Sequence, residues 1–311
     1  MNKQITDTIL MIRPVKFHGN EETVENNYYQ KTIKGLTRSQ IQIKAETEFD
    51  GLVDKLKSKR INVIVVNDTE QPVTPDSIFP NNWISFHNDG DVMLYPMFAK
   101  NRRVERRIDI INQLRDSFIV NTVEDLSNWE LEDKFLEGTG SMILDRINHI
   151  AYAVISDRTH QEVLIDFCKR KKYKPVSFHS LQTVGKERLP IYHTNVMMCL
   201  GEEFAVICLA AIDDENERSI VSKSLIENRK EIIEIDESQN GNFAGNMLQV
   251  SNSSKQRYIA MSDTAFKCLH SDQIEKLEKH GEIIHSNLNT IETLGGGSAR
   301  CMMAEIFLPR K

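Results

Sequence analysis

The sequence predicts an α/β fold, a five-bladed pseudo-symmetric α/β propeller in which strand–strand–helix–strand units surround a central cavity. Two observations predict it. A unit of two apolar strands, an amphipathic helix and one more short strand recurs along the chain. The strand pairs begin near residues 83, 141, 194, 245 and 299. This period is typical of units that bury their apolar faces on their neighbours. The pattern alone equally allows a generic α/β fold with one mixed sheet.

The first unit shows how each element is identified. Its two strands, WISFH and DVMLYPM, are joined by the turn residues Asn88, Asp89 and Gly90. A helix is expected from about Asn101 to Ser117, because apolar residues recur there at helical spacing. The short strand FIVNT follows and completes the unit.

The remaining units repeat this order. The second has SMILDR, IAYAVIS, a helix over about 157–171 and KPVSF; the third has NVMMCL, FAVICLA, a helix over about 215–228 and EIIEID; the fourth has NMLQVS, YIAMS, a helix around 271–280 and EIIHS. The fifth unit is split, since ARCMMAEIFL ends the chain whereas TILMIRP, a helix over about 49–58 and NVIVV begin it. We therefore expect residues 1–311 to form a single domain whose last strand pairs with the N-terminal unit.

Composition excludes several classes of protein. The chain has 311 residues, 40% hydrophobic and 27% charged, as ordinary globular proteins have, and no apolar segment approaches the roughly 20 residues that span a membrane. A net charge of −6 without a basic block argues against nucleic-acid binding. Five cysteines without a CxxC pair argue against a disulfide framework and a zinc site. The N-terminal stretch lacks a signal-peptide cleavage site, so we expect a cytoplasmic protein.

The segments that precede the five inner strands carry the residues suited to chemistry. These segments are IFPNNW, LEGTGS, IYHTNV, QNGNFAGN and GGGSARC. In a ring of units they would converge at one end, which brings together a carboxylate, an imidazole, a thiol and several amides: Glu137, His193, Cys301, Asn81, Asn82 and Asn195. A nucleophile, a base and an acid that share one cavity suit covalent catalysis at an electrophilic carbon.

Each of these residues also has a purely structural interpretation. Cys301 alone is typical of a buried small hydrophobe, and His193 or Glu137 alone of a structural contact or a turn cap. The glycines at 295–297 permit a tight approach to the strand. A phosphate-binding loop is disfavoured there, because such a loop needs a helix after the glycines and a strand is expected instead.

The same residues lie in motifs with a family resemblance. EGTGSMILD, YHTNV and GGGSARCMM resemble the motifs of the guanidine-modifying, or pentein, superfamily, which includes arginine deiminases, dimethylarginine dimethylaminohydrolases and amidinotransferases. The stretch TPDSIFPNNWISFHNDGDVMLYPMFAKNRRVERR resembles the amidinotransferase-like, citrulline-utilising hydrolase branch. The resemblance covers nearly the whole chain. It implies a single pentein catalytic domain that needs no metal and no organic cofactor.

The resemblance also implies roles for individual residues. Cys301 is expected to attack the central carbon of a guanidino or ureido group, His193 to protonate the departing amine and then activate water, and Glu137 to orient both. Arg158, and either Arg102 or Arg103, are expected to bind the α-carboxylate of an amino acid, a task that suits the arginine fork. The segment RRVERR is also typical of a solvated basic helix face.

Two amides bear on the substrate. Relatives that act on cationic guanidinium usually carry acidic residues where this chain has Asn82 and Asn195, and a guanidinium buried without carboxylates is costly. An asparagine, which offers a donor and an acceptor, suits a neutral ureido group. The sequence thus favours a hydrolase that converts citrulline to ornithine, with Asn81, Asn82 and Asn195 contacting the small-molecule substrate.

Other readings stay open. They are an arginine-type deiminase, a substituted-arginine dihydrolase, an amidinotransferase, and a ligand-binding pseudoenzyme. The sequence allows a homodimer, and it allows residues 123–134 and 181–189 to be either lids or ordinary loops.

Overall fold

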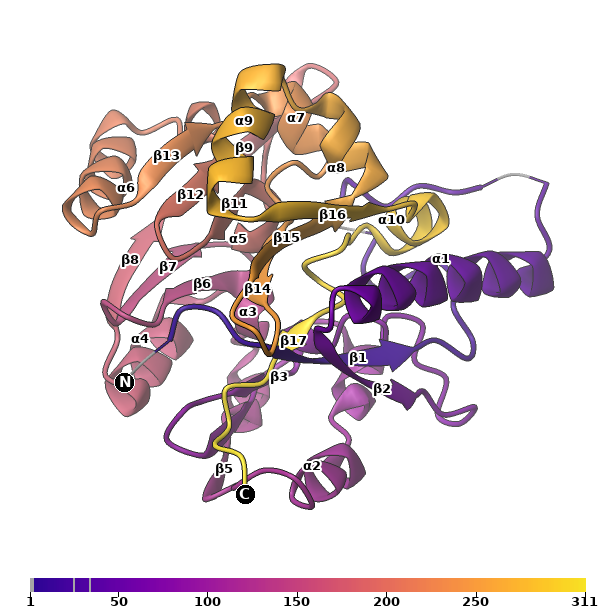
Figure 1. The fold of residues 1–311 in the computed structure, drawn as a ribbon. Helices are drawn as coiled ribbons and strands as arrows, with labels where there is room; N and C mark the ends of the chain where they lie inside the picture. Colours follow the sequence, from indigo (N-terminus) through magenta and orange to yellow (C-terminus); the bar gives the residue numbers. More distant parts are fainter. Residues whose placement is uncertain (1–2, 25, 34) are drawn as a thin grey trace.

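The strands form separate small sheets of one repeated design. The computed structural model describes residues 3–24, 26–33 and 35–311. Within them, five sheets have three strands each, with an inner strand antiparallel to the middle strand and an outer strand parallel to it. One continuous mixed sheet, the alternative that the pattern allowed, is therefore wrong. The mixed α/β class and the recurring strand unit are confirmed (Figure 1).

The sheets follow the predicted units. Each sheet is given from its inner to its outer strand. The first unit forms β3 (Ile84–Phe86), β4 (Asp91–Leu94) and β5 (Thr122–Asp125), and the second forms β6 (Met142–Asp145), β7 (Ile150–Val154) and β8 (Lys174–Phe178). The third forms β11 (Met198–Leu200), β12 (Phe204–Ile207) and β13 (Glu231–Glu234), the fourth forms β14 (Leu248–Ser251), β15 (Arg257–Ser262) and β16 (Glu282–Ser286), and the split fifth forms β17 (Ala304–Glu305), β1 (Thr8–Arg13) and β2 (Asn62–Asn67). A separate hairpin consists of β9 (Leu181–Val184) and β10 (Glu187–Pro190). The two ends of the chain share a sheet, because Ile9 pairs with Glu305 and Leu10 with Ala304.

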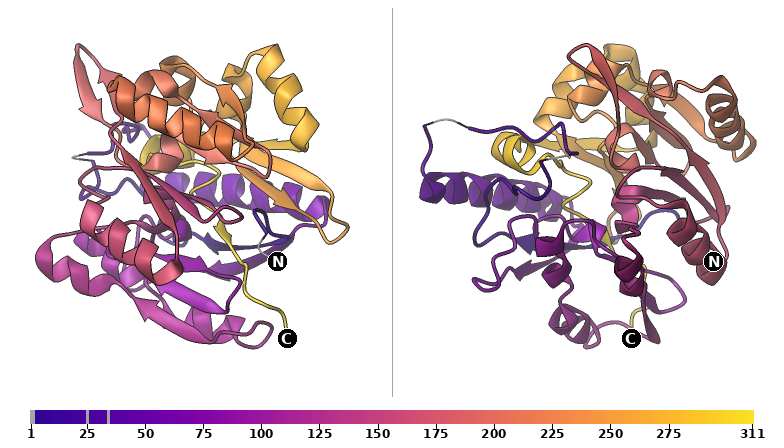
Figure 2. Two further views of the ribbon diagram at one scale, coloured as in Figure 1. Left: turned by 90° about the vertical axis from the view of Figure 1, so that its left-hand side faces the viewer. Right: turned by 180° about the vertical axis from the view of Figure 1, so that it is seen from behind.

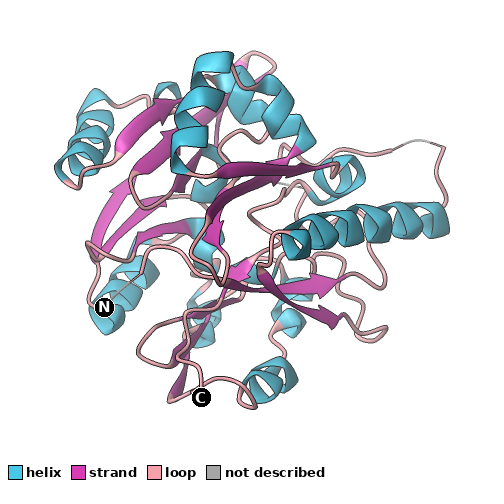
Figure 3. Cartoon of the chain, viewed as in Figure 1, coloured by secondary structure: helices cyan, strands magenta, loops and turns pink. Residues whose placement is uncertain are grey.

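Helices complete the units. The longer ones are α1 (Arg38–Ser58), α2 (Ile108–Leu114), α4 (Gln161–Lys171), α6 (Glu215–Glu227), α8 (Asp263–Cys268), α9 (Ser271–His280) and α10 (Asn289–Gly295). Short turns are α3 (Gly138–Ser141), α5 (Thr194–Met197), α7 (Glu237–Gly241), and the 3-10 turns η1 (Pro80–Asn82), η2 (Lys100–Glu105), η3 (Ser127–Glu132) and η4 (Leu209–Ala211). The long helices lie at the periphery and most strands lie inside them (Figure 3). No helix in the described ranges is long and apolar enough to cross a membrane.

Some predicted boundaries are wrong for local reasons. The helix expected over 101–117 is divided into η2 and α2, because the backbone of Arg107 between them is extended. The preceding residue, Arg106, donates hydrogen bonds from its guanidinium to the Tyr95 carbonyl and to Glu130. Helix α1 begins eleven residues before the predicted position 49, where Thr37 and Gln40 form a capping box. It projects from the rest of the molecule (Figures 1 and 2).

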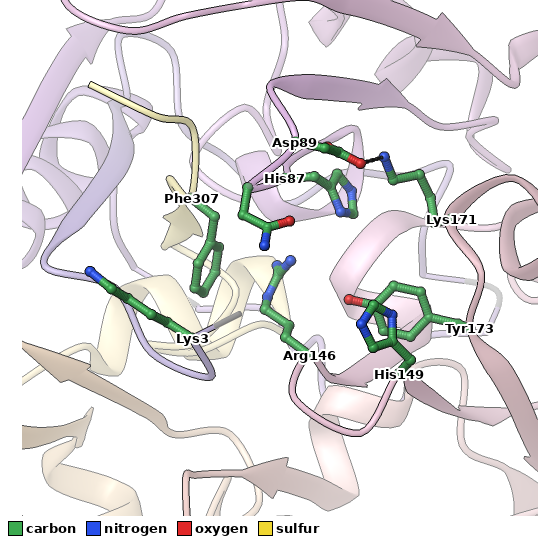
Figure 4. A pocket seen from close by; sticks show the side chains of 9 residues that line it. Lys3, His87, Asp89, Arg146, His149, Lys171, Tyr173 and Phe307 are labelled. Carbon is green, nitrogen blue, oxygen red and sulfur yellow. Dashed lines mark hydrogen bonds and ion pairs between the residues drawn. The ribbon is translucent and has the colours of Figure 1, made fainter. Parts of the chain in front are cut away.

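A cavity lies at the far ends of the inner strands. It measures about 350 Å³ with its open mouth included, and its lining includes His87 after β3, Arg146 after β6, and Lys171 and Phe307 (Figure 4). Two of its cations have protein partners, since Lys171 pairs with Asp89 at 2.6 Å and the Arg146 guanidinium lies 3.9 Å from the Phe307 ring centre. The expected site residues precede the same strands, so they lie at the opposite strand ends.

Candidate active site

The expected site residues share one local structure, a tight turn that leads into an inner strand. Glu137 precedes the single turn α3, and Gly138 after it has a positive φ of 48°. A Cβ at Gly138 would lie 2.3 Å from the Asn81 carbonyl oxygen, so only glycine lets these two turns touch. His193 likewise precedes α5, and Asn81 and Asn82 lie in η1. The turns aim their side chains inward before each strand begins.

Glu137 and His193 form a buried pair. Nε2 of His193 lies 2.8 Å from one carboxylate oxygen of Glu137, and the other oxygen accepts the N–H of Phe98 at 3.0 Å. Burial opposes ionisation, but Arg158 and the imidazole outweigh it and lower the pKa of Glu137 to about 2. Burial lowers the pKa of His193 to about 4, an effect that Glu137 only partly opposes. At neutral pH the carboxylate is therefore charged and the imidazole neutral.

This pKa shift predicts a pH-dependent stability. Because the folded pKa of His193 lies below its ordinary 6.5, the unfolded chain binds the proton more tightly, and stability is lost as the pH falls from 6.5 through about 4. The loss from this residue should reach about 3 kcal/mol in the free energy of unfolding. Urea titrations of the wild type and His193→Gln at several pH values measure the difference between them. Equal pH dependence in both proteins would refute the assignment.

Two arginines converge on Glu137. Arg158 Nη1 lies 3.7 Å and Arg102 Nη1 4.0 Å from the same carboxylate oxygen, and both arginines are only 2% exposed. Arg102 also donates to both oxygens of Glu105 and, at 2.9 Å, to Oδ1 of Asn82. The structure therefore brings Arg158, Arg102 and Asn82 to the pair.

Arg103 is not brought to the site. Its Nε donates to the Met97 carbonyl at 3.1 Å and lies 3.5 Å from Glu130, and its guanidinium faces the Phe135 ring. Of the two neighbouring arginines, only Arg102 is placed beside Glu137.

Cys301 is presented by a glycine-rich turn. Helix α10, which the sequence reading missed, ends at Gly295, and Gly296 follows with the left-handed φ of 63° common after helix ends. The N–H of Cys301 then bonds the Ser298 carbonyl at 3.0 Å, and two further tight turns lead into β17. The glycines thus end a helix and let the chain reverse, and the expected strand over 299–308 shrinks to Ala304–Glu305.

Two amides contact the sulfur. Nδ2 of Asn195 and Nδ2 of Asn246 each lie 3.3 Å from Sγ of Cys301. Asn246 was not singled out from the sequence, although its segment was recognised as the entry to the fourth inner strand. The signal that could have found it is its position directly before that strand, equivalent to Asn82 in the first unit.

Unsatisfied polar atoms gather around these groups. Five buried atoms within the described residues have no hydrogen-bond partner here: Asn26 Nδ2, Asp76 Oδ1, Asn81 Oδ1, Asn82 Nδ2 and Asn195 Oδ1. Each such atom costs roughly 1–3 kcal/mol when it stays unpaired. A cluster of unpaired donors and acceptors indicates a place for a polar ligand.

An N-terminal segment contacts the residues around the site. Arg158 donates to Oδ1 of Asn26 at 2.9 Å and to the Thr23 carbonyl at 3.1 Å, and Asn27 donates to the Gly295 carbonyl at 3.3 Å. Cys301 is only 3% exposed. Of the two segments that the sequence allows as lids or loops, 123–134 includes β5 and η3, and 181–189 lies in the β9–β10 hairpin.

The chain matches a family and several solved structures. The family model described as N,N dimethylarginine dimethylhydrolase, eukaryotic, matches residues 13–308. No curated protein matches the chain. An N-terminal domain of ArgZ, covalently bound to a reaction intermediate, has a TM-score of 0.73 at 20% identity and covers 97% of this chain and 98% of that one.

Two further structures extend the comparison. AgrE, in a ternary complex with ornithine and NAD+, has a TM-score of 0.72 at 20% identity, over 98% of this chain but 40% of that one. A dimethylarginine dimethylaminohydrolase adduct with S-methyl-L-thiocitrulline has a TM-score of 0.63 at 14% identity, over 97% and 99%. The chain thus spans less than half the length of AgrE, and these likenesses concern the fold.

Proposed function

The chain belongs to the N,N dimethylarginine dimethylhydrolase family, within the guanidine-modifying (pentein) superfamily, and on that premise we propose that it is a cysteine-dependent hydrolase of a C–N bond in a ureido or guanidino amino acid. Citrulline is the favoured substrate, with ornithine as product. Cys301 is the nucleophile, His193 the proton donor and acceptor, and Glu137 the group that orients the imidazole and the substrate. The five sheets are the blades of a single pentein domain with the site at one end of its axis.

One observation carries the preference for a ureido group, the orientation of the Asn82 amide. Arg102 can only donate hydrogen bonds, so the Asn82 oxygen must face it, at 2.9 Å. The NH₂ group of Asn82 is left buried and unpaired. A ureido oxygen accepts from such a donor, whereas every nitrogen of a guanidinium presents N–H groups. Beside Cys301, the unpaired Oδ1 of Asn195 can accept a ureido N–H.

Charge balance supports the same choice. Glu137 faces two buried arginines, and burial raises the pKa of Glu105, the other carboxyl partner of Arg102, to about 8, so little negative charge is left to pair a cationic substrate. Burial raises the pKa of Asp76, although Arg102 opposes it, which weakens this carboxyl as a partner for a cation. A neutral ureido group avoids the cost of burying an unpaired guanidinium.

The reaction then follows from the groups present. The Cys301 thiolate attacks the ureido carbon, and the bond from that carbon to the side-chain nitrogen of ornithine breaks. In the bound complex the neutral imidazole of His193 takes up a proton from solvent, is then stabilised as an imidazolium by Glu137 at 2.8 Å, and gives the proton to the departing nitrogen. A carbamoyl group stays on sulfur. Water, losing a proton to His193, displaces the sulfur and yields carbamate, which decomposes to carbon dioxide and ammonia.

Hydrolysis of arginine or of a substituted arginine is the second candidate. Family membership favours it, and Asp76 and Glu137 offer carboxylates beside Arg102. The same thiolate would then expel ammonia or a substituted amine before water attacks. Arg158 would bind the α-carboxylate in either reaction, whereas Arg102, whose donors are used by Glu105, Asn82 and the Asp76 and Phe79 carbonyls, would hold the Asn82 amide in place.

The substitution Asn82→Asp separates the two candidates. It keeps the oxygen that faces Arg102 and replaces the unpaired donor by an acceptor. The value of kcat/KM for citrulline should fall on the order of 10²-fold, because a donor to the substrate oxygen is lost and two acceptors then face each other, whereas turnover of arginine should rise. Parallel assays of ornithine and ammonia release measure both. Undiminished citrulline turnover, or arginine turnover confined to the wild type, would overturn the ureido preference.

A further inference from the structure

The sulfur of Cys301 is held by amide donors. In the described part of the chain, Sγ accepts hydrogen bonds from Nδ2 of Asn195 and Nδ2 of Asn246, each at 3.3 Å. The imidazole of His193 is directed to Glu137 through Nε2, and the Arg300 guanidinium next to Cys301 is used by the Met303 carbonyl and Glu305. The nearest polar contacts of the nucleophile are therefore neutral N–H groups.

The orientation of Asn246 is fixed by its other contacts. Its Oδ1 accepts the backbone N–H of Arg300 at 3.0 Å, so its NH₂ must point the other way. One N–H of that group meets the Asn195 carbonyl at 2.7 Å and the second meets Sγ. Asn246 is fully buried, and both ends of its side-chain amide are used in hydrogen bonds. An amide held in this manner presents a permanent donor to the sulfur.

We propose that Asn246, together with Asn195, stabilises Cys301 as a thiolate in the empty enzyme. A sulfur that receives two N–H donors is favoured as an anion, because a thiolate is a much stronger acceptor than a thiol. The proton that leaves the sulfur passes to the solvent. The inference rests on Cys301 as the nucleophile of the proposed function, and it supplies what a neutral ureido substrate lacks, namely a charge able to stabilise the thiolate.

The ultraviolet thiolate absorbance of the whole protein tests this proposal without any substrate. The absorbance of Cys301 is obtained as the difference between each protein and the same protein carrying Cys301→Ala, followed across pH. In Asn246→Asp, which keeps the acceptor for Arg300 and removes the donor, and in Asn246→Ala, the ratio of thiolate to thiol at a given pH should fall by at least about tenfold. The difference should vanish well above the ordinary thiol range, where every thiol is ionised.

A matched control separates this role from simple damage to the fold. Asn240→Asp makes the same change at another buried amide, one that donates to the Tyr29 hydroxyl, and it should leave the Cys301 signal unchanged. Equal thiolate ratios in wild type and both Asn246 variants would overturn the proposal. A reduced ratio in protein that turns over neither citrulline nor arginine would leave this inference standing and refute the proposed function alone.

Discussion

Replacement of Cys301 by alanine is expected to abolish turnover, with kcat reduced on the order of 10⁴-fold or more, because the covalent route is lost and water must attack the ureido carbon directly. The fold should be retained, since alanine fills most of the space of a side chain that is 3% exposed and accepts only amide hydrogen bonds. Ornithine release from citrulline, compared between the two purified proteins, measures the effect.

Cys199→Ala is the matched control for this change. Cys199 is also buried, but it lies in the inner strand β11, where burial raises the pKa of its thiol to about 12. This variant should keep turnover within a fewfold of the wild type. Comparable loss in both variants would show that cavities, and not the nucleophile, account for the result.

Glu137→Gln is expected to damage both catalysis and stability. The carboxylate is fully buried and faces His193, Arg158 and Arg102, so the variant leaves two buried arginines without their shared anion. Breaking one side of a buried ion pair typically costs about 3–5 kcal/mol. Because no carboxylate then stabilises the imidazolium of His193, kcat should fall by a further factor of roughly 10² or more. Urea unfolding and steady-state kinetics measure the two effects separately.

Asp145→Asn is the control for the stability part. Asp145 is equally buried, pairs with Lys230 at 3.4 Å, and ends the same strand β6 that Glu137 precedes. Its replacement should also lower stability, yet the folded fraction should turn over at close to the wild-type rate. If Asp145→Asn abolished turnover as thoroughly as Glu137→Gln does, a specific role for Glu137 at the reacting carbon would be untenable.

The repeated strands could be predicted from the sequence because the pattern that identifies a strand lies within a few neighbouring residues. KPVSF and EIIHS are segments of strand length that contain apolar residues, and the structure gives them as β8 and β16 with the same bounds. The start of α1 was missed since its first turns are mostly exposed and polar, and only the cap at Thr37 marks it. Helix boundaries that depend on caps and tertiary contacts are poorly encoded in apolar spacing.

The residues of the site likewise divide into those that the sequence could predict and those that it could not. Cys301, His193 and Glu137 could be named because each precedes an inner strand, a position that the repeat itself defines. The choice between Arg102 and Arg103 could not be made, because they are adjacent in a 3-10 turn whose direction depends on Glu105 and Asn82. Asn26 and Arg158 are hydrogen-bonded although they lie 132 positions apart, so no local sequence pattern predicts their contact.

The most direct measurement is rapid acid quenching of the wild-type enzyme with citrulline, and separately with arginine, followed by mass spectrometry of the peptide that contains Cys301. The proposed chemistry predicts a carbamoyl group on Cys301 with citrulline, formed as ornithine is released and absent from Cys301→Ala. Ornithine release without any adduct on Cys301, or at an equal rate in Cys301→Ala, would contradict covalent catalysis by this residue.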